Sequence, residues 1–375
     1  MRKFPGVLVA VLVATSLILA ACAGASPTAG EPSEPESEAP SSESAAPSVE
    51  PIDFKACMVS DVGGFDDNSF NENGLQGLER AREELGVEIA TLQSDSEEDY
   101  DRNINQFISD GCDMIITVGF LLGDATKEAA EANPDVRFAI VDFAYDPPIP
   151  NVEGLVYNTA QAAMLAGYAA ASWSKTDIMG TFGGINIGPG VTDFMDGFIA
   201  GMNYWNEQKG ESVRMLGGRD PLDPASGTFT GDFTSTDNAK NVTIGFLQEG
   251  ADVILPVGGP IGQGTFAAIR EQNADAVGLG VDVDWTQTVP EYADLMLVSI
   301  IKRIDNSVFQ AIERAVNGEP PEAVFLSDLA NEGVGISPFH EYEDEISDEV
   351  KAEIEELRQA IIDGEIEPSD YYSVE

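Results

Sequence analysis

The sequence is 375 residues long, and its 66 acidic residues outnumber its 19 basic residues to give a formal net charge of −47. Such a charge argues against nucleic acid or an anionic lipid surface as a partner, because both repel an acidic protein. The chain has one histidine and three cysteines, so no His and Cys cluster predicts a zinc or other transition-metal site. We expect neither a bound metal nor a cofactor.

The N-terminus has the pattern of an export signal. Arg2 and Lys3 precede an apolar stretch, Val7 to Ala21, that is too short to cross a bilayer comfortably. This stretch ends in small residues directly before Cys22, which predicts a bacterial lipoprotein signal over residues 1–21 and a lipid on Cys22. The alternatives are an ordinary cleaved signal or an uncleaved anchor. We therefore expect the protein on the extracytoplasmic face of the cell membrane, anchored by lipid.

After Cys22 the composition changes abruptly. Residues 22–52 are dominated by Ser, Glu, Pro and Ala, with no aromatic and no basic residue. Such a segment cannot bury enough apolar surface to offset the entropy lost on ordering, so it predicts a disordered stalk. No later stretch approaches the ~18 consecutive apolar residues of a membrane-spanning helix, and we expect no second span.

From Asp53 onward, apolar strand-like runs alternate with amphipathic helical segments at intervals of about 20 to 30 residues. This alternation predicts an α/β fold with parallel sheets that are covered by helices on both faces. The expected strands are 56–60, 87–92, 114–118, 138–141, 178–183, 213–216, 253–257 and 276–281. The expected helices are 68–85, 97–111, 123–132, 160–174, 192–208, 236–249 and 264–273.

The pattern occurs as two consecutive blocks of similar size, which predicts two lobes with a cleft between them. The expected first lobe comprises residues 53–158 plus about 285–318, and the second comprises 159–284 plus about 319–345. Residues 346–375 would form a C-terminal amphipathic helix and tail.

Two cysteines lie beside expected strands. Cys57 is near the start of the first strand, and Cys112 directly precedes the third. If these strands are neighbours in one sheet, the two side chains could form a disulfide, which an exported protein is permitted to have. The alternative is two free, buried cysteines.

Five of the expected strands end in glycine or a carboxylate. Asp61, Gly119, Asp142, Gly258 and Asp282 follow these strands. Ligands of open α/β sheets bind at the carboxyl ends of the strands, glycine lets backbone approach a ligand, and carboxylates accept hydrogen bonds from hydroxyl or ring N–H groups. The pattern favours a binding site, although Asp and Gly are also ordinary loop residues.

The run DVGGFDDNSFNENGLQGLERA resembles the opening signature of the basic-membrane-protein (BMP-type) family, the purine-nucleoside-receptor-like lipoproteins that bind solutes for ABC transporters. Further matches follow in the same order as in the family, and together they extend from Asp53 to Ile366. They are SDSEEDYDRNINQFISDGCDMIITVGFLLGDAT, FAIVDFAY, QAAMLAGYAAA, GDFTSTDNAK, EGADVILPVGGPIGQGT, LGVDVDW, SIIKRIDNSVFQAI and IIDGEI.

The resemblance implies a periplasmic-binding-protein fold of type I, in which two Rossmann-like lobes are joined by three crossovers. It implies capture of a nucleoside, chiefly a purine one, by a monomer that delivers it to an ABC permease. The alternative is a surface lipoprotein that acts as a sensor or adhesin with no transport role. We do not expect an enzyme, because the sequence has no Gly-x-Ser-x-Gly motif and no plausible Cys–His couple.

The family motifs also imply individual roles around the base. Asp61 would lie at the base end of the pocket, and Phe70 would stack on one face of the base. Asp142 would hydrogen-bond the purine edge, and Phe233 would supply the second stacking ring. Gly258 would offer a backbone contact.

Asp282 and Lys302 match the pair that holds the ribose hydroxyls. From its charge, Lys302 is expected to pair with a pocket carboxylate such as Asp282, and the alternative is contact with an anionic group of the ligand. Asp67 and Asn71 are weaker ligand candidates, because they are also placed to cap the first helix. We expect Phe194 to belong to a helix core and not to stack on the ligand.

Overall fold

The computed structural model describes residues 49–220, 223 and 225–372, and the expected lipidation site Cys22 and most of the expected stalk lie outside these residues. The strands of the first sheet are β1 (Lys55–Val59), β2 (Glu88–Leu92), β3 (Met114–Val118), β4 (Arg137–Val141), β5 (Val152–Tyr157) and β11 (Val324–Ser327). Those of the second sheet are β6 (Ile178–Gly183), β7 (Arg214–Leu216), β8 (Val253–Val257), β9 (Val277–Asp282), β10 (Met296–Lys302) and β12 (Val334–Ile336).

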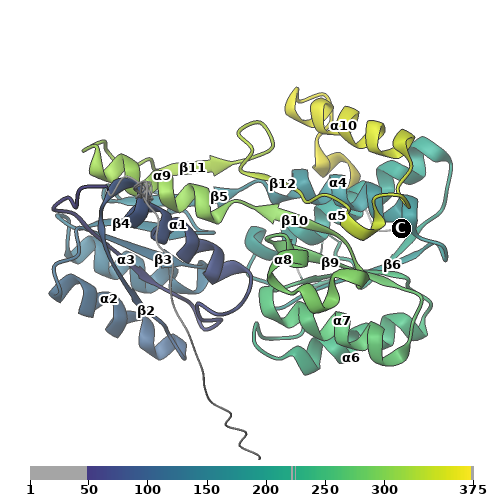
Figure 1. Ribbon diagram of the computed structural model, residues 1–375, viewed down its shortest axis with the longest axis horizontal. Helices are drawn as coiled ribbons and strands as arrows, with labels where there is room; N and C mark the ends of the chain where they lie inside the picture. Colours follow the sequence, from purple (N-terminus) through teal and green to yellow (C-terminus); the bar gives the residue numbers. More distant parts are fainter. Residues whose placement is uncertain (1–48, 221–222, 224, 373–375) are drawn as a thin grey trace, which may run out of the picture. The chain divides into compact units, whose positions relative to one another are not determined.

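The helices are α1 (Phe70–Leu85), α2 (Tyr100–Ser109), α3 (Gly123–Ala132), α4 (Thr159–Trp173), α5 (Pro189–Lys209), α6 (Thr236–Gln248), α7 (Gln263–Gln272), α8 (Trp285–Thr288), α9 (Ile304–Val316) and α10 (Asp348–Ile362) (Figure 1). The predicted alternation of strands and helices is confirmed, and the predicted helix 123–132 and strands 114–118, 178–183 and 253–257 have the predicted bounds.

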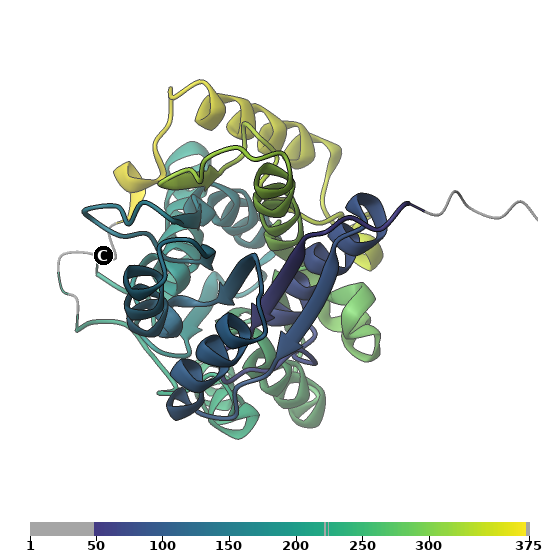
Figure 2. The same ribbon diagram turned by 90° about the vertical axis from the view of Figure 1, so that its left-hand side faces the viewer.

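Each sheet has six strands, and the two orders correspond position by position: β11-β5-β4-β3-β1-β2 and β12-β10-β9-β8-β6-β7. All strand pairs in the first sheet are parallel, and in the second sheet only β10 and β12 pair antiparallel. The prediction of two α/β lobes with parallel sheets is therefore confirmed. In Figure 2 the half of the molecule that contains the first sheet faces the viewer, and β1 and β2 lie next to each other.

Strand β1 illustrates why the strands of these sheets have continuous apolar sequences. Ala56 and Met58 point to the face covered by α1, whereas Cys57 and Val59 point to the opposite face, where α2 and α3 pack. Successive side chains of a strand alternate between the faces, so a strand covered on both sides needs apolar residues at every position. All four residues are fully buried.

The sheets divide the chain at other points than we expected. Residues 285–318 were assigned to the first lobe, but β10 within this range pairs with β9 in the second sheet. Residues 319–345 were assigned to the second lobe, but β11 pairs with β5 in the first sheet. The chain crosses between the sheets three times: after β5, after β10 and between β11 and β12.

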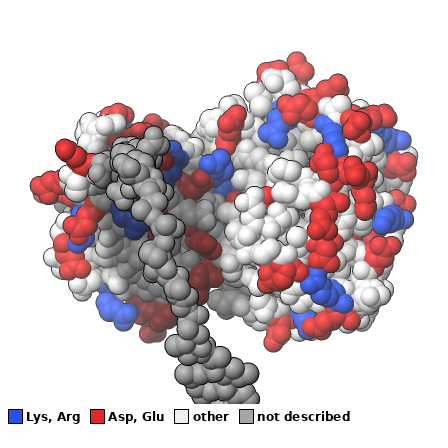
Figure 3. Space-filling model, in the orientation of Figure 1, with Lys and Arg blue, Asp and Glu red and all other residues white. Residues whose placement is uncertain are grey.

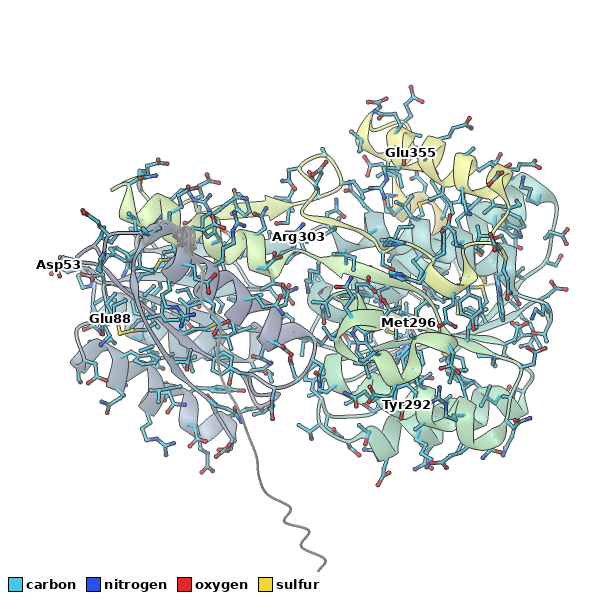
Figure 4. All side chains as sticks on the ribbon, viewed as in Figure 1. Asp53, Glu88, Tyr292, Met296, Arg303 and Glu355 are labelled. Carbon is cyan, nitrogen blue, oxygen red and sulfur yellow. A yellow bond between two sulfur atoms is a disulfide. The ribbon has the colours of Figure 1, made fainter. Side chains whose placement is uncertain are left out.

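The second of these crossovers can be followed in the figures. Met296 and Arg303, labelled in Figure 4, mark the start of β10 in the second sheet and the first residue beyond it. Helix α9 follows and packs against α1 of the first sheet, where the Arg80 guanidinium lies 3.8 Å from the centre of the Phe309 ring. The carboxyl end of β10 is therefore also where the chain passes from one sheet to the other.

Strand β5 was not predicted, because Glu153 and Gly154 interrupt its apolar run. In the fold, the Glu153 side chain is fully buried and forms ion pairs with Arg137 of β4 and Arg314 of α9. A buried carboxylate is tolerated only when charged or hydrogen-bonding partners replace water. These partners come from elsewhere in the chain, so the local sequence gives no sign of them.

Cys57 and Cys112 form a disulfide, with their Cα atoms 6.1 Å apart. β1 and β3 are neighbours, as the pairing of Cys57 with Ile115 shows, and this register brings the start of β3 beside β1. Both cysteines are buried among the residues under α2 and α3. The bond closes a loop of 55 residues across the first sheet.

The C-terminal helix α10 begins after Ser347, whose hydroxyl accepts a hydrogen bond from the Val350 N–H at 3.2 Å. Ile354, Leu357 and Ile361 are buried, and α10 packs against α4. Among the described residues, no helix is both long enough and apolar enough to cross a membrane. Figure 3 shows acidic side chains spread widely over the visible face with fewer basic ones, in line with the net charge.

Candidate functional site

A pocket with about 580 Å³ of empty volume is lined by residues that follow strands of both sheets. All nine residues that the sequence predicted as ligand contacts line it: Asp61, Asp67, Phe70, Asn71, Asp142, Phe233, Gly258, Asp282 and Lys302. The carboxyl ends of the strands therefore meet at one site, although they are widely separated in sequence.

Asp61 follows β1 and is held by its own loop. Its Oδ1 atom accepts hydrogen bonds from the Gly63 N–H and the Asn71 side-chain amide, both at 2.8 Å. The side-chain oxygen of Asn71 in turn accepts a hydrogen bond from the Asp61 N–H. Burial raises the pKa of Asp61 to about 6, and the hydrogen bonds from Asn71 and Gly63 oppose this rise.

Asp67 caps helix α1, as its position in the sequence suggested. Its carboxylate accepts hydrogen bonds from the backbone N–H groups of Ser69, Asn71 and Glu72. These N–H groups have no partner within the helix, and a carboxylate at this end also complements the helix dipole. Because Asn71 joins Asp67 to Asp61, the cap also orients the pocket carboxylate.

Asp142 and Asp282 occupy equivalent places at the ends of β4 and β9, and both have left-handed backbones, with φ of 62° and 69°. Few residues other than glycine adopt this conformation, and aspartate is among those that tolerate it best. The glycines after the neighbouring strands, Gly119 and Gly258, also have positive φ, 113° and 158°. The chain therefore turns sharply after these four strands. The turns bring backbone groups and carboxylates to the wall of the pocket.

Lys302 is the last residue of β10, and only 1% of its side chain is exposed. Its ammonium group donates a hydrogen bond to Oδ2 of Asp142 at 2.7 Å. Lys302 therefore pairs with a pocket carboxylate, as expected, but the partner is Asp142 and not Asp282. Asp282 instead accepts a hydrogen bond from the Ser69 hydroxyl at 2.8 Å. Lys302 still acts on Asp282 through its charge, which lowers the pKa of that carboxyl, while burial has the larger effect and raises it to about 6.

Phenylalanine rings form the apolar part of the wall. Phe70 and Phe194 each lie 5.3 Å, centroid to ammonium nitrogen, from Lys302. Phe194 belongs to the core of α5, as expected, and it also lines the pocket. Phe233 packs so closely on Gly184 that a Cβ there would lie 2.4 Å from its ring.

Several pocket residues were not singled out from the sequence. Ile187 and Gly190 lie in the glycine-rich run after β6, which lacks the full spacing of a dinucleotide-binding motif. Phe120 begins the short 3₁₀ helix after β3, and the residue is 36% exposed. Ser69 is fully buried beside the pocket and contacts Asp282. Only its position before α1 could have indicated it, because serine at a helix start usually serves as a cap.

Comparisons with known proteins agree with this architecture. A family model described as "ABC transporter substrate-binding protein PnrA-like" matches residues 54–370. The CD4+ T-cell-stimulating antigen of Listeria monocytogenes is 32% identical over 331 residues, which cover 84% of this chain and 87% of the relative. The ABC transporter nucleoside-binding protein BmpA of Lactococcus lactis is 28% identical over 332 residues, covering 84% of this chain and 88% of the relative.

Among solved structures, an ABC transporter system solute-binding protein from Aeropyrum pernix K1 is similar, with a TM-score of 0.74 and 25% identity. The match covers 84% of this chain and 92% of that one. With its two parallel sheets and three crossovers, the chain has the type I periplasmic-binding-protein fold that the sequence resemblance implied. The family match extends over nearly all of the described residues. The chain therefore belongs to the family of PnrA-like ABC transporter substrate-binding proteins.

Proposed function

We propose that this protein captures a nucleoside, with a purine preferred, in a cleft between its two lobes, and delivers it to an ABC permease. One observation carries the proposal. The pocket combines phenylalanine faces, strand-end carboxylates and a single buried lysine, and these groups come from both sheets. A nucleoside is a flat heteroaromatic ring joined to a polyol, so it needs aromatic faces for the base and charged or polar acceptors for its N–H and hydroxyl groups.

For the base, we assign stacking to Phe70 and Phe233, which enter the pocket from different halves of the chain. We assign the purine edge to Asp142. Lys302 uses the Oδ2 atom of this carboxylate, and within the described part of the chain no hydrogen bond reaches Oδ1, so that atom can accept one from a ring N–H. Asp61 would lie at the base end, and Gly258 would offer its backbone.

For the sugar, we assign the vicinal hydroxyls to Asp282 and Lys302. Asp282 accepts one hydrogen bond from Ser69 and retains acceptor capacity for a ligand hydroxyl. The lysine ammonium has three N–H donors, of which Asp142 takes one. A ligand that contacts groups from both sheets favours the arrangement in which the sheets approach each other.

The relative from Lactococcus lactis is named a nucleoside-binding protein, which supports this ligand class. The test is isothermal titration calorimetry on the full-length lipidated chain in detergent micelles. Co-purified ligand is first removed by unfolding and refolding with the disulfide kept oxidised. Guanosine, inosine, adenosine, uridine, cytidine and ribose are the titrants. We expect one-to-one binding of a purine nucleoside and no heat from ribose. A folded protein that binds none of the nucleosides would contradict the proposal.

We also propose that the mature chain is anchored to the outer face of the cell membrane through lipid on Cys22 and acts as a monomer. The leader and the small residues before Cys22 support the anchor. A Cys22→Ala variant should leave the membrane fraction and appear in the soluble exported fraction. If the variant remains in the membrane after a high-salt wash, a lipid on this cysteine is not the anchor.

A further inference from the structure

Ser69 connects the start of α1, in the first sheet's half of the chain, with the end of β9 in the second sheet. Its hydroxyl lies 2.8 Å from Oδ2 of Asp282 and 3.1 Å from the Val281 carbonyl oxygen, and its side chain is fully buried. A Cβ on Gly259, in the loop after β8, would lie 3.8 Å from the Ser69 Cβ. The residue before α1 therefore contacts the end of β9 in the other sheet and lies near the segment that follows β8.

Asn73, one helical turn further along α1, makes an equivalent connection to the end of β10. Its side-chain amide donates a hydrogen bond at 2.7 Å to the backbone carbonyl of Lys302. Its side-chain oxygen accepts a hydrogen bond from the Asp305 N–H at 3.1 Å, in the first turn of α9. Asn73 is 3% exposed, so both bonds are shielded from water. They fix the backbone at the point where the chain crosses between the sheets.

Ser69 and Asn73 lie four residues apart, so they occupy the same side of the helix start. One holds the side chain of Asp282, and the other holds the backbone of Lys302. Neither is among the residues that line the pocket. We infer that Ser69 and Asn73 are positioning residues, which fix the two groups assigned to the ribose hydroxyls and thereby set the affinity for the sugar. This inference rests on the proposed function.

The charge around Asp282 supports this role. The charged groups that face it are Lys302 on β10, Asp142 after β4 and Asp67 before α1. Burial and the two carboxylates favour the protonated form of Asp282, whereas the lysine and the Ser69 hydroxyl favour the ionised form. Only the ionised form accepts hydrogen bonds with both oxygens, so the Ser69 bond helps to keep Asp282 in the state that a hydroxyl ligand needs.

The test measures the ionisation of Asp282 separately from ligand binding. The carboxyl carbon of Asp282 is followed by NMR in the ligand-free, full-length chain labelled at aspartate, between pH 4 and 8, and assigned with Asp282→Asn. In Ser69→Ala the titration midpoint should move to higher pH. The affinity for guanosine at pH 7.5 should fall roughly tenfold, the size of one lost hydrogen bond to a charged group.

Ser69→Thr keeps the hydroxyl, so it should restore both values. Asn73→Ala should weaken guanosine binding but leave the Asp282 titration unchanged. Ser94→Ala is the matched control, because it removes a fully buried hydroxyl that accepts a hydrogen bond from Asn103, away from the second sheet. It should change neither value.

An Asp282 titration that is the same in Ser69→Ala and in the wild type would overturn the inference for Ser69, even if guanosine binds. Unchanged guanosine affinity in Asn73→Ala would overturn it for Asn73. If the wild type binds no nucleoside, the proposed function fails, and the NMR titration still decides whether Ser69 controls Asp282. The two failures are therefore distinguishable.

Discussion

Lys302 and Asp142 form an ion pair 2.7 Å long, with side chains only 1% and 6% exposed, although 160 residues separate them in sequence. The lysine ammonium also lies 5.1 to 5.3 Å from the ring centres of Tyr157, Phe70 and Phe194. The three rings exclude water and attract the cation through their π faces. The pair joins the end of β4 in the first sheet to the end of β10 in the second.

This pair determines the result of substituting Asp142. Asp142→Ala should abolish most of the purine affinity, and it should also lower the free energy of unfolding by about 3–5 kcal/mol, because it leaves a buried ammonium without a partner. Calorimetric titration with guanosine and thermal unfolding measure the two effects.

The double variant Asp142→Ala, Lys302→Met separates these two effects. It removes the unpaired charge, so it should recover most of the lost stability without recovering guanosine binding. Wild-type guanosine affinity in Asp142→Ala would exclude Asp142 as the group that binds the purine edge.

Phe70→Ala and Phe233→Ala should each weaken purine nucleoside binding by about 1–3 kcal/mol, the usual contribution of stacking one base on an aromatic ring. The loss should be smaller for uridine, whose base has one ring. Phe325→Ala is the control, since this half-buried ring packs against Arg314 and does not line the pocket. Equal losses for the control and the pocket variants would show that the rings act through stability, not through stacking.

Asp61 should make stability and ligand binding respond to pH in opposite directions. Its pKa is raised to about 6 in the folded state from an ordinary value of 3.8, so the folded protein binds the proton more tightly than the unfolded chain. This stabilisation is complete below pH 3.8 and is lost as the pH rises through about 6. Between pH 7.5 and 4 the wild type should gain up to about 3 kcal/mol relative to Asp61→Asn.

Over the same range, affinity for a nucleoside should fall, because protonation removes acceptor capacity from Asp61 and Asp282. Denaturant unfolding and calorimetric titration at pH 7.5, 6 and 5 measure the two trends. Affinity that rises on acidification would mean that these carboxyls bind the ligand as hydrogen-bond donors.

The disulfide should stabilise the fold without taking part in binding. It closes a loop of 55 residues, for which loop-closure entropy corresponds to about 4 kcal/mol. The double variant Cys57→Ala, Cys112→Ala should therefore have a free energy of unfolding lower by about that amount and a lower denaturant midpoint, and reduction of the wild type should have the same effect. Guanosine affinity should not change, since neither cysteine lines the pocket. If a folded double variant binds guanosine with altered affinity, packing under α2 and α3 influences the pocket, and the prediction is contradicted.

Part of the site could be predicted from the sequence, because the apolar pattern of a single strand shows where that strand ends. A strand buried on both faces must be apolar throughout, so β3 and β8 were found with the predicted bounds, and the residues after them were expected at the ligand edge. β5 was missed for the opposite reason. Glu153 interrupts its apolar pattern, and the two arginines that make its burial possible come from other strands and helices.

The sequence by itself determined the class of fold, the family and nine of the residues that line the pocket, because strand periodicity and motif order are properties of short segments. Only the tertiary structure decided which charged and polar groups pair. Lys302 contacts Asp142 and not Asp282, Asp282 contacts Ser69, and β10 belongs to the second sheet. The first two pairings depend on how two sheets with equivalent strand orders bring their carboxyl ends together. Contacts between residues more than 150 positions apart leave no periodic signal in the chain.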